Sequence, residues 1–120
     1  MPHVVIEGPI SLEDIWIAYH PLDITEGDAR FKTEGCYLSK DKSELLLAAL
    51  VVERGYVRKF YLKLHQHQES LTVKLDPMTD PEKTDGVRRL VAIIAERILA
   101  AVPEVRVART NIKPFLHIDT

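Results

Sequence analysis

The residues at the start of the sequence could perform acid–base chemistry. Pro2 follows Met1, so removal of Met1 would leave a proline whose ring nitrogen is a free secondary amine. Such an amine accepts a proton near neutral pH when burial or a nearby cation disfavours its charged form. Arg30 is a candidate for that cation. Pro2 is therefore a candidate general base; the alternative, which the motif alone favours, is that a proline at this position has no chemical role.

A second candidate is the segment from Tyr56 to His67, in which polar and apolar residues alternate as in a strand with one buried face. Its polar face carries Lys59, Tyr61, Lys63, His65 and His67. An aromatic ring among cations can stack on a base while the cations contact phosphate, which suggests RNA or a small anion as ligand. The net charge of −2 argues against a dedicated nucleic-acid binder. The alternative is a solvated face that serves solubility alone.

The histidines and the cysteine are the remaining candidates for chemistry. His65 and His67 fall on the same side of their strand, and such a pair can hold one metal ion. No third or fourth ligand is spaced to join them, so we predict no metal site. Cys36 is the only cysteine, which excludes an intrachain disulfide and favours a reducing compartment. No motif supplies it with a base, so we interpret Cys36 as a small packed side chain.

The secondary-structure elements that must position these residues follow from the spacing of apolar residues and from the prolines and glycines that end each element. The segment from Pro2 to Glu7 is β-branched and bounded by Gly8 and Pro9, which predicts a strand. Ser11 and the apolar stripe after it predict a capped helix that Pro21 ends. The segment 22–28 contains a glycine and three acids, so we predict a loop there.

The central part of the sequence is typical of strands joined by short turns. The segments 29–39 and 45–52 predict a hairpin, although 44–50 is also rich in helix formers and periodicity alone leaves a helix open. The preceding pairing partner and Gly55 favour a strand there. The segments 56–67 and 71–75 alternate and predict two more strands, with Leu62 and Leu64 pointing inward.

A long amphipathic helix follows these strands. Asp80 as N-cap and Pro81 at the first helical position predict its start, and Pro103 its end. Its apolar stripe is Val87, Leu90, Val91, Ile94 and Ile98, and its polar side Arg88, Arg89, Glu96 and Arg97. Val105 and Val107 predict a last strand. The sum is an α+β fold, a mainly antiparallel sheet with one long and one short helix on one face.

Composition indicates one ordinary domain spanning residues 1–120. The chain has 16 Lys and Arg against 18 Asp and Glu, and 46% of its residues are hydrophobic. A chain of this length buries enough surface to fold without metals or disulfides. It contains no run of about 20 apolar residues, which a bilayer span needs, and no secretory leader pattern. We therefore expect a cytoplasmic protein with no membrane contact.

Met1-Pro2-His3 opening a strand, a helix, and Gly27-Asp28-Ala29-Arg30 before a hairpin that ends near Gly55 together resemble the 5-carboxymethyl-2-hydroxymuconate isomerase branch of the tautomerase superfamily. The likeness covers about half of the chain and extends loosely to the helix from Glu82 to Val102. It implies β-α-β elements, a homotrimer and no cofactor. The first helix is shorter than the family's, and the hairpin from Tyr56 to Leu75 is an addition to its pattern.

The resemblance also implies residue roles. Pro2 would be the base in a keto–enol isomerisation, Arg30 would hold a substrate carboxylate and stabilise the enolate, and His3 would help to orient the substrate. Our leading hypothesis is therefore a tautomerase or isomerase that acts on a small carboxylate. The alternative is a non-catalytic oligomeric module that binds RNA or a small anion through the face running from Lys59 to His67.

Overall fold

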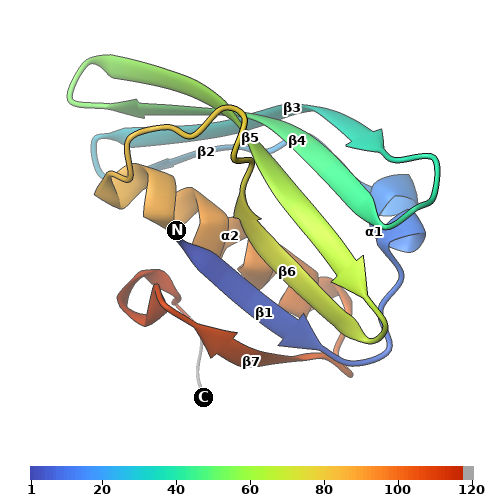
Figure 1. The fold of residues 1–120 in the computed structure, drawn as a ribbon. Helices are drawn as coiled ribbons and strands as arrows, with labels where there is room; N and C mark the ends of the chain where they lie inside the picture. Colours follow the sequence, from blue (N-terminus) through green and yellow to red (C-terminus); the bar gives the residue numbers. More distant parts are fainter. Residues whose placement is uncertain (118–120) are drawn as a thin grey trace.

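One antiparallel sheet, in the strand order β2-β3-β4-β5-β6-β1-β7, forms the body of the protein (Figure 1). The structure is a computed structural model that describes residues 1–117. Within that range the strands are β1 (His3–Glu7), β2 (Asp23–Glu26), β3 (Ala29–Leu38), β4 (Glu44–Glu53), β5 (Tyr56–His67), β6 (Ser70–Leu75) and β7 (Arg106–Thr110). The helices are α1 (Leu12–Ala18), α2 (Asp85–Ala101) and the 3-10 turn η1 (Lys113–Phe115).

Strands β3 to β6 follow one another as a meander, and alternation of side chains gives the sheet two unlike faces. Leu45, Leu47, Ala49 and Val51 of β4 are buried, which settles the segment 44–50 as strand rather than helix. Phe60, Leu62 and Leu64 of β5 share that buried face, and the polar residues between them lie on the other face. The alternation predicted for β5 is confirmed.

Helix α2 supplies the second layer of the core. Figure 1 shows it lying across one face of the curled sheet. Its buried side includes Val87, Leu90, Val91, Ile94 and Ile98, which confirms the predicted stripe. These side chains pack in one cluster with the inward residues of β1, β4, β5 and β6. The α+β class and the antiparallel sheet are thus as predicted, whereas the tautomerase-like β-α-β arrangement stays a prediction.

Two predictions of local structure were wrong. Strand β2 lies where a loop was expected, because Asp23–Glu26 pairs with β3 and turns at Gly27, which adopts φ +61. Helix α2 begins at Asp85 rather than Pro81, and its N-cap is Thr84, whose hydroxyl accepts a hydrogen bond from the Val87 amide. The partner of β2 is the next strand along the chain, whereas the start of α2 is bound by Glu53, which is distant in the sequence.

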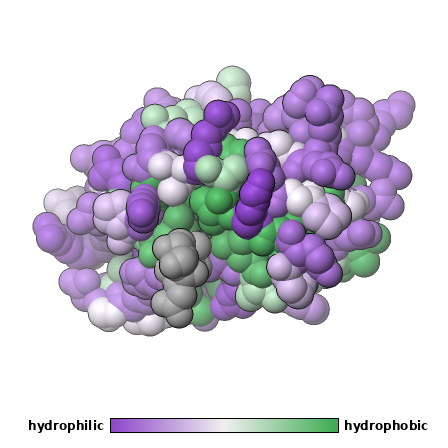
Figure 2. All heavy atoms as spheres, turned by 90° about the horizontal axis from the view of Figure 1, so that it is seen from below, coloured by the Kyte–Doolittle hydropathy of each residue, from purple (hydrophilic) through white to green (hydrophobic). Residues whose placement is uncertain are grey.

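Apolar side chains also reach the surface. Figure 2 shows them gathered in the middle of the face seen from below, between polar side chains. In the part of the chain that the structure describes, no helix is both long and apolar enough to cross a bilayer.

Candidate functional site

An apolar cavity lies between the two helices and the inner face of the sheet. Its volume is about 220 Å³. The lining comes from α1 and the segment after it, from β3, β4 and β5, and from the second half of α2. It comprises Ile15, Ala18, Tyr19, His20, Leu22, Thr33, Cys36, Leu45, Leu47, Leu64, Ile94, Arg97, Ile98, Ala101 and Val102. A concave apolar space with few polar groups is the usual form of a small-molecule site.

Helix α1 forms one wall of this cavity and is held in place by side chains of the sheet. Its N-cap is Ser11, as the sequence predicted, and the Ser11 hydroxyl accepts a hydrogen bond from the Asp14 amide. The side-chain oxygen of Gln66 accepts from the Leu12 amide at 2.9 Å, and its nitrogen donates to the Ile10 carbonyl at 2.6 Å. The Trp16 indole donates to the Cys36 carbonyl at 3.2 Å. These contacts fix a helix of only two turns over the cavity.

The hydroxyl groups that line the cavity are already hydrogen-bonded within the protein. The Tyr19 hydroxyl lies 2.8 Å from Thr33 Oγ1 and 2.7 Å from the Glu34 carbonyl oxygen. Thr33 Oγ1 also accepts a hydrogen bond from the Leu22 amide at 2.9 Å. Burial raises the pKa of Tyr19, and the hydrogen bond to Thr33 only partly offsets that effect. Tyr19 is therefore a neutral phenol that closes the wall rather than an ionised group.

Cys36 contributes a thiol to the same wall. Burial raises the pKa of Cys36 to about 11, because a thiolate would lose its hydration there. A thiol with so high a pKa is a poor nucleophile near neutral pH. The interpretation of Cys36 as a packed side chain fits this environment. The cavity is therefore suited to binding a small molecule rather than to thiol chemistry.

The opening of the cavity differs in character from its interior. His20 and Arg97 belong to the lining but are exposed to solvent. Ala18 and Ala101, which have small side chains, also line the cavity and are exposed to solvent. These four residues therefore lie at the rim of the cavity, where the apolar lining meets solvent beside a guanidinium and an imidazole.

The residues predicted for proton abstraction are not brought together within one chain. Pro2 is buried at the start of β1 and does not line the cavity, and the Asn111 side chain bonds the residues on either side of it, Met1 and His3. Arg30 lies on β3, where its guanidinium forms a bidentate ion pair with Asp23. Three strands separate β1 from β3, which corresponds to roughly 19 Å across the sheet. The roles of Pro2, Arg30 and His3 stay predictions.

The predicted anion-binding residues do share one surface. Lys59, Tyr61 and Lys63 lie on the outer face of β5, opposite Leu50, Ala48 and Leu46 of β4. The Lys63 ammonium is 3.0 Å from a Glu44 carboxylate oxygen and 3.8 Å from an Asp76 carboxylate oxygen, so much of its charge is neutralised. On the neighbouring strand β6, Lys74 lies directly opposite Lys63 of β5. On its other side, Lys74 lies opposite His3 of β1. Like charges at opposite positions repel, and a bound anion would relieve that repulsion.

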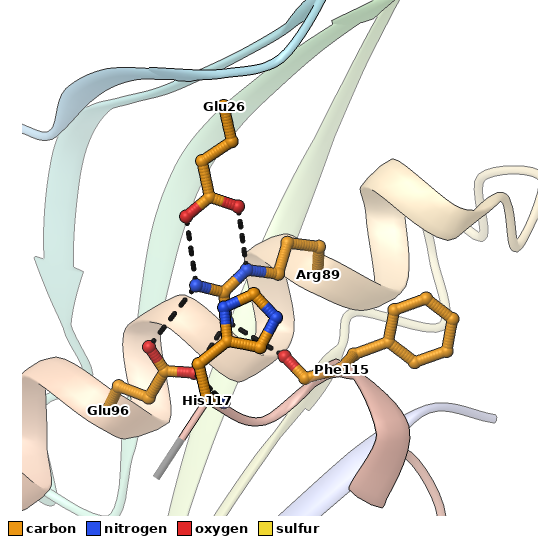
Figure 3. Close-up of polar contacts among 5 residues, drawn as sticks. All are labelled: Glu26, Arg89, Glu96, Phe115 and His117. Carbon is orange, nitrogen blue, oxygen red and sulfur yellow. Dashed lines mark hydrogen bonds and ion pairs between the residues drawn. The ribbon is translucent and has the colours of Figure 1, made fainter.

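A polar cluster on α2 was missed by sequence reasoning. Arg89, expected on the polar side of the helix, is buried, and Figure 3 shows its guanidinium pointing at two carboxylates. It donates to both Glu26 oxygens at 2.8 and 2.9 Å, to Glu96, and to the Phe115 carbonyl at 2.8 Å. The Glu26 hydrogen bonds raise the pKa of Arg89. Because every donor direction of the Arg89 guanidinium is occupied by protein, we interpret this cluster as a structural clamp between β2, α2 and η1.

Among the described residues there is no group of three or more His, Cys, Asp or Glu side chains arranged to hold a metal ion. No family model, curated protein or solved structure matches this chain. The cavity has no local sequence signal, since its lining comes from five elements. The apolar alternation of β4 and β5 predicted a buried face but could not predict that the space above it is incompletely filled.

Proposed function

We propose that this protein binds a small apolar molecule in the cavity beneath α1. The observation that carries the proposal is an apolar space of about 220 Å³ that opens to solvent and whose lining hydroxyl groups are hydrogen-bonded within the protein. A ligand that transfers apolar surface into such a space gains free energy without competing for polar groups.

The size of the cavity argues against an ordinary packing defect. Protein interiors contain few voids larger than a water molecule. Because this space of about 220 Å³ opens to solvent, water covers its apolar lining when no ligand is bound. A ligand that displaces this water removes apolar surface from contact with water, which is favourable.

The proposal is tested by narrowing the opening without disturbing the core. Ala101 and Ala18 line the cavity and are exposed, so Ala101→Phe and Ala18→Phe would place a ring across the opening. Ala100→Phe is the matched control, because Ala100 is exposed on the same helix and does not line the cavity. We would titrate 1-octanol and toluene into each protein and measure heat and the fluorescence of Trp16, the only tryptophan.

We expect binding to the unsubstituted protein and to Ala100→Phe, and at least tenfold weaker binding to Ala101→Phe and Ala18→Phe. The proposal fails if neither probe binds, or if both blocking variants bind as well as the control.

A second candidate function is proton transfer by Pro2 on a small carboxylate, the function implied by the resemblance to tautomerases. The specific observation that favours it is the burial of Pro2, since burial would lower the pKa of a free proline amine toward neutrality. Arg30 would then have to come from a second copy of the chain. The prediction is that the native protein lacks Met1 by intact mass and ketonises phenylpyruvate enol, and that Pro2→Ala abolishes this. A native protein that retains Met1 contradicts it.

A further inference from the structure

The opening of the cavity carries a positive charge, the Arg97 guanidinium, that has no ion-pair partner in the described part of the chain. Arg97 forms no ion pair with any side chain in residues 1–117, whereas the other two arginines of α2 do, Arg88 with Asp85 and Arg89 with Glu26 and Glu96. His20 lies beside the same opening. None of the fifteen lining residues is an aspartate or glutamate. The entrance therefore favours a negative group on whatever enters.

The position of Arg97 on its helix places it next to the apolar lining. Ile94 and Ala101 are three residues before and four residues after it, and residues at these spacings lie on one side of a helix. All three contribute to the lining. A group bound by the guanidinium would thus lie at the end of an apolar body held between α1 and α2.

The interior offers no polar partner of its own. Every buried side-chain nitrogen or oxygen in the described part of the chain has a hydrogen-bond partner. Within the cavity wall, the Tyr19 and Thr33 hydroxyls bond to each other and to the backbone. A polar group deep in the cavity would lose its water without compensation. A charged ligand must therefore keep its charge at the opening.

We propose that the ligand is a small amphipathic carboxylate, with its apolar body in the cavity and its carboxylate bound by Arg97 beside His20. This inference rests on the proposed function and names its ligand class. A guanidinium matches a carboxylate better than a lysine ammonium does, because it donates two parallel hydrogen bonds. An engineered 150 Å³ cavity holds benzene, so 220 Å³ suits an apolar body of about nine non-hydrogen atoms. Medium-chain and arylalkyl carboxylates have this size.

The test compares an acid with the alcohol of the same chain length. Octanoate and 1-octanol would be titrated into the full chain at pH 7.5, and their dissociation constants measured by calorimetry. The variants are Arg97→Gln, which removes the charge, and Arg88→Gln as matched control. Arg88 is on the same helix but pairs with Asp85 and does not line the cavity. Each variant's melting temperature without ligand would also be measured, because a cation in the second half of a helix can stabilise it through the helix dipole alone.

We expect octanoate to bind about tenfold more tightly than 1-octanol, as a charge-assisted hydrogen bond in a partly exposed site would give. Arg97→Gln should remove that difference and leave the affinity for 1-octanol unchanged, and Arg88→Gln should change neither. Added salt should weaken binding of octanoate only.

The outcomes separate this inference from the proposed function. Equal affinity for the acid and the alcohol, unaffected by Arg97→Gln, would overturn the assignment of a carboxylate while the apolar site stands. If neither ligand binds, the proposed function itself fails. A loss of thermal stability in Arg97→Gln with unchanged affinities would show that Arg97 serves the helix rather than a ligand, and would also overturn the inference.

Discussion

At the scale of single residues, Cys36 is the most direct reporter of the cavity, because it is the only cysteine and lines the wall. With a pKa of about 11, roughly 0.1% of the thiol is ionised at pH 8. We therefore expect its reaction with a disulfide reagent such as DTNB to be far slower than that of glutathione. The rate should rise about tenfold for each pH unit between 8 and 10, because only the thiolate attacks.

A ligand in the cavity should slow this reaction further, and Cys36→Ser provides the background rate. The prediction is contradicted if Cys36 reacts at pH 8 as fast as glutathione, or if its rate is independent of pH.

At the scale of secondary-structure elements, the start of α2 depends on a carboxylate from the sheet. The Glu53 side chain of β4 accepts hydrogen bonds from the Thr84 hydroxyl and from the Gly86 amide, the latter at 2.8 Å. A Cβ at position 86 would collide with the Glu53 carboxylate. The absence of a side chain at Gly86 is what allows Glu53 to reach the first turn of the helix, where a negative charge is favourable.

This contact predicts an unusual effect of alanine in a helix. Alanine is normally about 1 kcal/mol better than glycine in a helix interior. Here we expect Gly86→Ala to lower the free energy of unfolding by about 1–3 kcal/mol, because it displaces Glu53 or crowds it. The measurement is urea denaturation of the single and double variants. In the background of Glu53→Ala, Gly86→Ala should cost nothing or stabilise the protein; equal costs in both backgrounds would contradict the explanation.

The outer face of β5 supports a second prediction at this scale. If Lys59 and Lys63 form an anion-binding surface, then Lys59→Ala/Lys63→Ala should elute from a heparin column at lower salt than the unsubstituted protein. Lys40→Ala/Lys113→Ala is the matched control, since it removes two exposed lysines outside this strand. Identical elution of the two double variants would assign these lysines to solubility alone.

Local signals predicted most of the elements; they missed the short strand β2, which pairs with the adjacent β3, and misplaced the start of α2, where a distant partner decides. The start of α1 was predictable because its N-cap is local: the Ser11 hydroxyl accepts a hydrogen bond from the amide three residues later, that of Asp14. The leucines and alanines of β4 are compatible with either a helix or a strand, and its pairing with β3 and β5 makes it a strand. The start of α2 was misplaced because Asp80 and Pro81 give a complete local signal, whereas Glu53 is 33 residues from Gly86.

At the scale of the whole molecule, the Arg89 clamp ties together segments that are far apart in the sequence. Glu26 of the edge strand β2, Glu96 of α2 and the Phe115 carbonyl all accept hydrogen bonds from this one side chain. The Glu96 carboxylate in turn accepts from the His117 amide at 2.9 Å. Neither this cluster nor the cavity could be predicted, because both are assembled from elements whose relative placement only the complete sheet determines.

The clamp predicts a dependence of stability on pH. The hydrogen bonds from Arg89 lower the pKa of Glu26 below its ordinary value of 4.5. A carboxyl whose folded pKa is lowered stabilises the protein above its unfolded pKa and loses this effect as the pH falls through the folded value. Glu26→Gln should therefore cost about 1 kcal/mol at pH 7, and the difference from the unsubstituted protein should shrink below about pH 4.5.

Urea denaturation at pH 7, 5, 4 and 3 measures this difference. Asp28→Asn is the control, an exposed carboxylate in the adjacent turn without an ion pair in residues 1–117. A cost of Glu26→Gln that stays constant from pH 7 to pH 3 would contradict the ion-pair explanation.

The position of β1 determines when the sheet can be completed. This strand precedes both of its neighbours, β6 and β7, in the sequence, and Val4 lies opposite both Val73 and Thr110. During synthesis, one edge of β1 can pair once β6 has been added, but its other edge stays open until β7 follows. Folding should be slow for so small a protein, as is usual when contacts join distant parts of a chain. Until β7 is in place, the open edge of β1 is where chaperones would bind or aggregation would begin.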